Sequence, residues 1–194
     1  MEQYFGYKKL SELLNVKISG RVSGFGGCFG GVSGFGGCFG GVCCTANVSS
    51  NTIIKNAPYL FANCEKLEVV SVGENVIFDT NNLFHNCFSL KELNLSEGLR
   101  VLGNATFAGC GFRRLFIPSG TIIEGHYSFG NSPNLHSVEF GDDCVVSGYS
   151  TFEGCSNLEI VKAGKHVEFL GENTFDNCSK FECIFGDSDI VLEY

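Results

Sequence analysis

Cysteine is the residue type with the most evident chemistry in this sequence, since it occurs eleven times in 194 residues. Cys64, Cys87 and Cys110 follow one another at 23-residue intervals, and Cys155 and Cys178 repeat that interval. Zinc sites favour a C-x-x-C knuckle, and this sequence has none. Cysteines side by side on stacked coils would have Cβ atoms farther apart than the about 3.8 Å that a disulfide bond prefers. We therefore predict buried structural thiols, eleven of them free in the unfolded chain, with no metal and no cofactor.

Other residue types with catalytic uses do not gather in the sequence. His85, His126, His136 and His166 occupy four different positions of the 23-residue period, whereas a catalytic site in a repetitive fold would place its residues at adjacent positions. No nucleophile elbow, H-E-x-x-H motif or paired-carboxylate arrangement stands out. We predict that the protein has no catalytic residues and is not an enzyme.

Acidic turns are a further candidate for chemistry. The segments "GDDC" (141–144) and "GDSD" (186–189) fall at nearly the same position of the period. Their spacing fits no full calcium loop, and glycine with aspartate is ordinary turn chemistry. Turns are the favoured interpretation, and a calcium-binding acidic ridge is the alternative.

The elements that position these side chains follow from the same period. A phenylalanine lies three residues before each cysteine of the column, and before Ser132, which fills the missing step after a one-residue deletion in "CGFRRLFIP". These residues are Phe61, Phe84, Phe107, Phe129, Phe152 and Phe175. Each unit also holds two short alternating pieces, such as "LEVVSV" and "NVIF", that predict strands. Self-similarity at 23 residues over six units is typical of a solenoid, in which neighbouring units bury a shared core.

The segment "FHNCFSLKELNLSEGLRVLGNATFAGC" resembles the BspA-like leucine-rich repeat family, whose pattern is F-x-x-C-x-x-L-x-x-V-x-I-P. The resemblance covers about residues 53–194 and implies a curved β-solenoid and non-enzymatic binding, often adhesion, in surface proteins of bacteria, protists and some viruses. We expect a mainly β fold: a right-handed leucine-rich-repeat β-solenoid of about six 22–23-residue coils, with a Gly/Phe/Cys-rich N-terminal segment. The F-x-x-C-x-x-L piece is expected to form a helical turn on the convex side.

The outward positions of the first strand in each unit form a candidate binding face. Its members are Glu92, Asn94, Arg114, Phe116, Glu139, Ile160, Lys162 and Phe185. Opposite charges in adjacent units can be read as cross-strand ion pairs, but solvent-facing Phe116, Ile160 and Phe185 suggest a contact surface for a ligand or another subunit. An irregular unit that tucks these side chains away is the alternative. We predict a protein or glycan receptor as the partner.

Charge and hydropathy exclude other classes of partner. Residues 1–50 carry four basic and two acidic groups, a net +2, whereas residues 51–194 carry nine basic and nineteen acidic groups, a net −10. Nucleic acid requires clustered lysine and arginine, so no nucleic acid is expected. No stretch approaches eighteen apolar residues, so no membrane insertion is expected. Polar residues from Lys8 to Lys17 interrupt any signal-like apolar run, and we expect synthesis without classical secretion.

Residues 23–42, "SGFGGCFGGVSGFGGCFGGV", contain one ten-residue phrase twice. The phrase lacks the glycine and lysine pattern of nucleotide-binding loops, and its four phenylalanines favour burial over a free tether. We predict a neck that packs between identical copies or against a larger particle. Before it, "YFGYKKLSELLNVKIS" has the spacing of a short amphipathic helix, and a frayed cap on the solenoid is the alternative.

Three parts are therefore predicted: an N-terminal anchor (1–20), a neck (21–50) and a solenoid binding body (51–194). The candidate assembly residues are Tyr4, Phe5, Tyr7, Leu10, Leu13, Phe25, Phe29, Phe35 and Phe39. Residues 51–194 are expected to fold alone as a monomer, and the full chain to form a homo-oligomer or to dock onto a larger assembly. The leading hypothesis is a virion appendage, such as a phage head or tail fibre, used for adhesion. A bacterial or protist cell-surface adhesin and an intracellular protein–protein scaffold are the alternatives.

Overall fold

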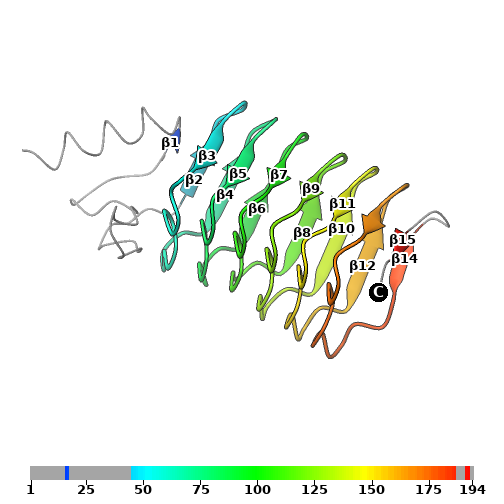
Figure 1. Cartoon of the computed structure of the whole chain (residues 1–194). Coiled ribbons are helices and arrows are strands. Elements are labelled where there is room, and N and C mark those ends of the chain that lie inside the picture. The colour runs from blue at the N-terminus through cyan, green and yellow to red at the C-terminus, as the bar shows by residue number, and fades with distance from the viewer. Residues whose placement is uncertain (1–15, 18–44, 187–190, 193–194) are drawn as a thin grey trace, which may run out of the picture.

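A computed structural model describes residues 16–17, 45–186 and 191–192 of the chain. Within these ranges the protein consists of strands and turns without a helix, and therefore has no helix that could cross a membrane. The strands wind into a β-solenoid of about six turns, whose coils lie side by side (Figure 1). This confirms the mainly β solenoid expected from the period.

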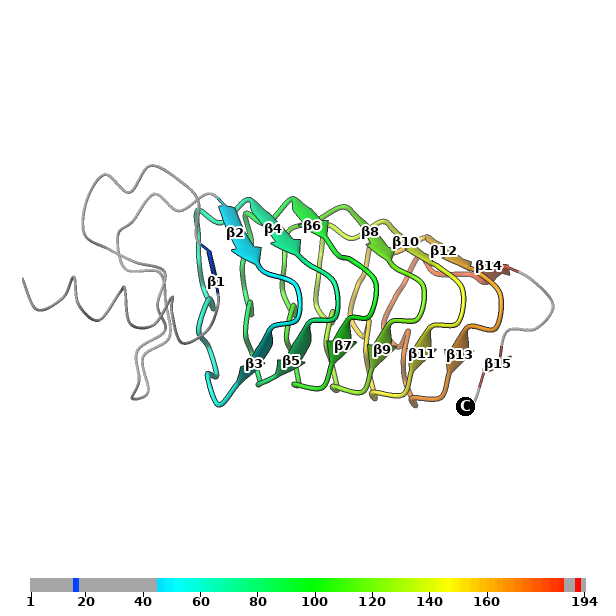
Figure 2. The same cartoon turned by 90° about the horizontal axis from the view of Figure 1, so that it is seen from above.

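Two parallel series of strands line opposite sides of the solenoid (Figure 2). The first series is β2 (Thr45–Val48), β4 (Val69–Val72), β6 (Glu92–Asn94), β8 (Arg114–Ile117), β10 (Ser137–Phe140), β12 (Ile160–Ala163) and β14 (Ile184–Gly186). The second is β3 (Ile53–Lys55), β5 (Ile77–Asp79), β7 (Arg100–Val101), β9 (Ile122–Ile123), β11 (Val145–Val146), β13 (Glu168–Phe169) and β15 (Val191–Leu192). A short strand, β1 (Val16–Lys17), pairs antiparallel with β2.

The two series differ in continuity. The second series forms one seven-stranded sheet, whereas the first is divided into β1-β2-β4-β6 and β8-β10-β12-β14. The division falls at the unit that is one residue short, between Cys110 and Arg114. There, the N–H of Gly111 donates to the carbonyl oxygen of Cys87, while no ladder joins β6 to β8. The deletion visible in the sequence therefore interrupts the ladder on one side only.

The core is built on the predicted phenylalanine column. Its rings stack coil on coil with centroids 5.0–5.6 Å apart and planes within 10° of parallel, from Phe61 to Phe175. Rings of the first five are fully buried. Phe112 occupies the leucine position in the short unit and contacts Phe129 edge-on at 6.3 Å. Stacked aromatic pairs of this kind stabilise beyond the area they bury.

The F-x-x-C-x-x-L piece forms tight turns, and the expected helical turn is wrong. In the second unit the N–H of Cys87 donates to Phe84 and that of Leu90 to Cys87, each three residues earlier. The residue before each cysteine-column position has a positive φ of 47–74°, which ends any right-handed helical run. These residues are Asn63, Asn86, Gly109, Asn131, Gly154 and Asn177, types that tolerate this conformation.

A recurrent glycine lies after the second strand of most units, at Gly103, Gly125, Gly148 and Gly171. A Cβ on Gly125 would collide with the carbonyl oxygen of Gly103 in the preceding coil, so the column has no room for a side chain. Three residues later a hydroxyl closes the turn, as where Ser128 Oγ donates to the carbonyl oxygen of Gly125 at 2.6 Å. Close coil approach thus explains the glycine column.

The solenoid begins earlier than the expected boundary at residue 51. β2 pairs in parallel with β4, with Ala46 opposite Val70 and Val48 opposite Val72, and both Ala46 and Val48 belong to the core. Residues 45–50, assigned from the sequence to the neck, are therefore part of the solenoid body. The predicted assembly residues between Tyr4 and Phe39 lie outside the described residues.

Candidate functional site

The eight residues of the candidate binding face, here called the strand face, all lie on the outside of the first strand series. Seven are exposed, while Ile160 is half-buried. Phe116 is 53% and Phe185 is 57% exposed, so the alternative in which these side chains are buried by an irregular unit does not apply to them. Because side chains alternate along a strand, the residues between them, such as Leu115 and Val138, point into the core.

The register arranges part of the strand face into one row. Phe116, Glu139, Lys162 and Phe185 are directly opposite one another on β8, β10, β12 and β14. The row therefore has an exposed aromatic side chain at each end and two opposite charges between them. Glu92 and Asn94 belong to β6, across the interrupted ladder, so they flank this row without sharing its sheet.

The charged residues of the strand face do not form the cross-strand ion pairs that the sequence allows. Within residues 45–186, no salt bridge joins Glu92 to Arg114 or Glu139 to Lys162. The ion pairs lie elsewhere, for example between Arg100 and Glu124 on the second sheet at 2.8 Å. Charged groups of both signs on the strand face are thus available to a partner.

A groove of about 510 Å³ lies at the C-terminal end of the strand face. Ile160 and Phe185 of the predicted set line it, together with Glu159, Lys180 and Glu182. The last three were missed because only strand positions were considered in the sequence, and these residues belong to the connections around β12 and β14. The sequence pattern that could have identified Lys180 and Glu182 is the cluster of charged residues around Phe181 in the last unit.

The cysteine column is a hydrogen-bonded ladder. Each thiol donates to the carbonyl oxygen of the column phenylalanine one coil earlier, as from Cys110 to Phe84 at 3.3 Å and from Cys178 to Phe152 at 3.2 Å. Burial raises the pKa of the Cys110 thiol well above its ordinary value. The interaction in which the Cys155 thiol donates to its neighbour Cys178 raises the pKa of Cys155, together with burial, and lowers that of Cys178. Because the thiolate is the nucleophile, burial and a raised pKa make Cys110 and Cys155 poor nucleophiles.

One cysteine departs from the predicted set of eleven free thiols. Cys64 is disulfide-bonded, while Cys87, Cys110, Cys144, Cys155, Cys178 and Cys183 are free, and among these only Cys183 is exposed. The prediction of eleven free thiols is therefore wrong at Cys64.

Asp142, Asp143, His126 and His166 bond between coils, whereas Asp187 and Asp189 of the second acidic segment lie outside the described residues. Asp142 accepts a hydrogen bond from the N–H of Lys165 at 2.8 Å, and Asp143 lies 3.1 Å from Nδ1 of His166. Nδ1 of His126 accepts from the N–H of Tyr149 at 3.0 Å. No group of three or more histidine, cysteine or acidic side chains within the described ranges could hold a metal ion. The turn interpretation therefore accounts for Asp142 and Asp143.

Comparisons with known proteins agree with this geometry. Residues 52–182 match the family described as "BspA type Leucine rich repeat region" in six copies. A solved structure of a leucine-rich repeat protein from Bacteroides ovatus is similar over 68% of this chain and 34% of that chain, with 23% identity and a TM-score of 0.54. The match thus spans about a third of that protein and shows the fold alone. No curated protein matches the chain.

Proposed function

Because the chain belongs to the BspA-type leucine-rich repeat family, we propose that it is a non-catalytic binding protein whose strand face recognises another protein. A solenoid of this kind suggests a binding or structural role. The observation that carries the proposal is the row of Phe116, Glu139, Lys162 and Phe185, two exposed aromatic side chains enclosing two unpaired opposite charges. Aromatic anchors beside complementary charges are typical of protein-recognition surfaces.

A protein partner fits the chemistry of the row better than a glycan does. Phenylalanine contributes apolar area at low conformational cost and has no hydroxyl or N–H with which to bind sugar hydroxyls. The charges of Glu139 and Lys162 would set the register of a partner with the reverse pair. A glycan is the second candidate, since the exposed ring of Phe116 can stack on the apolar face of a sugar.

Adhesion is the biological use that we propose for this recognition. The leading setting is a virion appendage, such as a phage head or tail fibre, and a bacterial or protist cell surface is the alternative setting. The composition of residues 1–50, rich in glycine and phenylalanine and opposite in net charge to residues 51–194, supports a separate docking part of the kind that an appendage needs. Antibody labelling of intact particles and cells in electron micrographs tests the setting.

Selection from a displayed protein library, in parallel with a glycan array, tests the function. The labelled full-length chain is the bait, and selected binders are measured against Phe116→Ser and Lys162→Glu. We expect about tenfold weaker binding for Phe116→Ser, equal to about 1.4 kcal/mol, and normal binding for the matched control Phe88→Ser. Phe88 is 60% exposed but lies in a turn and is not a residue of the strand face. The proposal would be contradicted if binders from either screen had the same affinity for Phe116→Ser and Lys162→Glu as for the wild type.

A further inference from the structure

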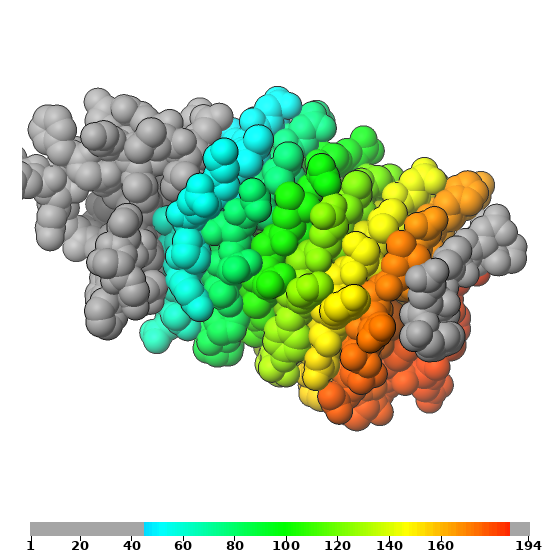
Figure 3. Space-filling model, in the orientation of Figure 1, coloured from blue at the N-terminus to red at the C-terminus, as the bar shows by residue number. Residues whose placement is uncertain are grey.

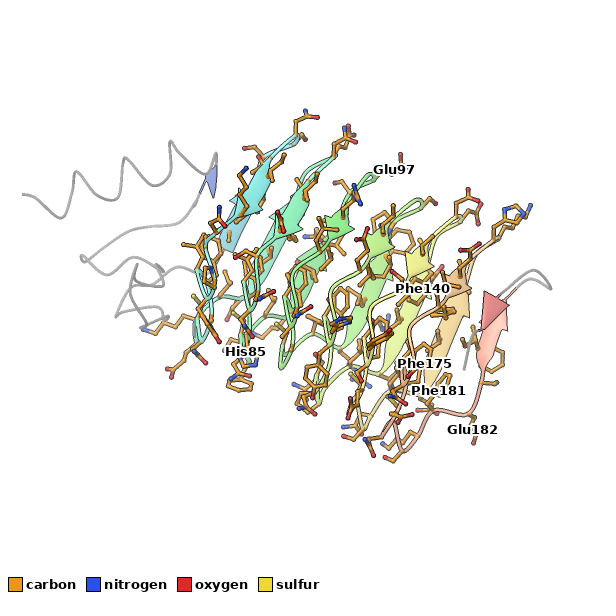
Figure 4. The ribbon with its side chains drawn as sticks, viewed as in Figure 1. His85, Glu97, Phe140, Phe175, Phe181 and Glu182 are labelled. Atoms are coloured by element: carbon orange, nitrogen blue, oxygen red, sulfur yellow. The ribbon has the colours of Figure 1, made fainter. Side chains whose placement is uncertain are left out.

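The groove at the end of the strand face has the composition of a docking site for a basic, aromatic segment. Its apolar part is Ile160 and Phe185, and its charged part is Glu159, Lys180 and Glu182. Glu159 lies 3.4 Å from Nδ1 of His136, whereas Glu182 takes part in no ion pair within residues 45–186. Figure 4 places Glu182 on the outermost described coil, beyond Phe175 and Phe181.

The strand beside the groove has one partner. In the described part of the chain β14 pairs with β12 and with no other strand. The opposite end of the same strand series differs, because β1 covers β2 there. An edge strand next to an apolar groove can receive an extended peptide, whose backbone bonds to the edge while its side chains enter the groove.

The sequence contains one segment that matches this groove in chemistry. Residues 4–10, "YFGYKKL", combine three aromatic side chains with Lys8 and Lys9. Residues 1–50 carry a net +2, whereas residues 51–194 carry a net −10. We propose that the groove binds residues 4–10 of a second copy of the chain, with the lysines facing Glu159 and Glu182 and the aromatic rings against Ile160 and Phe185.

The distance across the solenoid favours a second copy over the same chain. From Val16 in β1 back to Lys8 a fully extended chain spans about 27 Å, at about 3.4 Å per residue. Six strand spacings of about 4.8 Å separate β1 from β12, about 29 Å, and β14 is one spacing farther. The lysines of one chain therefore reach their own groove only if residues 8–15 run fully extended along the solenoid, whereas those of a neighbour meet no such requirement.

The contact joins the N-terminal part of one copy to the C-terminal end of another. Because the two surfaces are different, the interface is heterologous and repeats from copy to copy, as a row or a closed ring. This assigns a receiving surface to the assembly residues Tyr4, Phe5, Tyr7 and Leu10. Because the groove shares Ile160 and Phe185 with the strand face, a docked copy covers that end of the face.

Charge reversal on the full-length chain tests the proposal by sedimentation velocity over a range of protein concentrations. The wild type should self-associate, and both Glu182→Lys and the pair Lys8→Glu with Lys9→Glu should weaken association about tenfold or more. The matched control Glu97→Lys, an exposed turn residue on a coil far from the groove (Figure 4), should associate like the wild type. The three reversals combined in one chain should restore association, since the charges then complement each other again.

Three results would overturn the proposal. They are a wild type that is monomeric at all concentrations, a Glu182→Lys variant that associates like the wild type, and a combined variant in which association is not restored. Circular dichroism melts of every variant establish that each is folded. Receptor binding measured on the same variants separates this proposal from the proposed function, because none of the substituted residues belongs to the strand face.

Discussion

The thiol of Cys155 lies 3.4 Å from the carbonyl oxygen of Phe129, 26 residues earlier in the chain, and donates a hydrogen bond to it. The same contact recurs at the other described free cysteines of the column. It joins the two most regular columns of the sequence across neighbouring coils. The free cysteines of the column are thus explained as buried hydrogen-bond donors whose thiols reach the preceding coil.

Ser132 is the exception in that column and offers a stabilising substitution. It is fully buried, and its Oγ has no hydrogen-bond partner, because a C–O bond is shorter than a C–S bond and the hydroxyl falls short of the preceding coil. We expect Ser132→Cys to stabilise the fold by about 1 kcal/mol, the typical net value of one hydrogen bond. Urea unfolding measures the change, and the reverse substitution Cys110→Ser should destabilise. A Ser132→Cys variant no more stable than wild type would contradict this account.

The phenylalanine stack should dominate stability. Phe107 lies between Phe84 and Phe129, with centroid distances of 5.1 and 5.4 Å, and Phe152 is stacked in the same way. Replacing either by alanine leaves a cavity and should cost about 3–5 kcal/mol. Thermal and urea unfolding report the loss, and exposed Phe88→Ala should change stability by less than about 0.5 kcal/mol. Equal effects at Phe88 and Phe107 would show that the stack is not the core.

Alkaline pH should destabilise the protein through its buried thiols. Burial raises the pKa of Cys144 from 9.0 to about 11, so between these values the folded state retains a proton that the unfolded state has lost. Stability from this thiol is therefore complete below about pH 9 and falls by about 3 kcal/mol as the pH rises to about 11. Urea unfolding at pH 8 and pH 11 measures the fall, and in Cys144→Ala it should be smaller. Identical pH profiles of the two proteins would exclude a contribution from Cys144.

Thiol counting should reveal both the disulfide and the inert column. Because Cys64 is disulfide-bonded, the unfolded chain should give at most nine free thiols before reduction and eleven after it. In the native protein, exposed Cys183 should be alkylated within minutes, while buried Cys110, whose pKa is raised, should stay unmodified. Mass spectrometry of the peptides separates the two sites. Eleven free thiols without reduction would disprove the disulfide.

Much of the fold was predictable because a repeat places each residue type in a fixed environment. The period, the phenylalanine and cysteine columns and the outward strand positions all follow from spacing. The tight turns were also encoded, since asparagine or glycine precedes each position of the cysteine column, as at Asn86 and Gly109. The helical-turn prediction overlooked that these types indicate a positive φ.

Other features depend on geometry that spacing does not carry. The deletion after Cys110 is visible in the sequence. Whether it interrupts the hydrogen-bonded ladder in the first strand series, in the second or in both depends on how the backbone of each series pairs again after the missing residue. The groove requires Lys180 and Glu182, from the connection before β14, to lie beside Ile160 and Phe185, and the disulfide bond of Cys64 is not implied by the spacing of the column. Neither the ladder break, nor the groove, nor the disulfide bond can be derived from residue types that recur at a fixed spacing.

Interruption of the ladder between β6 and β8 also has a mechanical consequence. The coils, visible as parallel bands in Figure 3, are held on one side by seven continuous strands and on the other by two separate sets of four. A bend that draws β6 away from β8 breaks no strand ladder, whereas the same bend between any other neighbours in the first series does. Between Asn94 and Arg114 neighbouring coils are therefore joined by a strand ladder in the second sheet alone. A bend at this place would change the separation of Glu92 from Phe116 and leave intact the ladders that hold the row from Phe116 to Phe185.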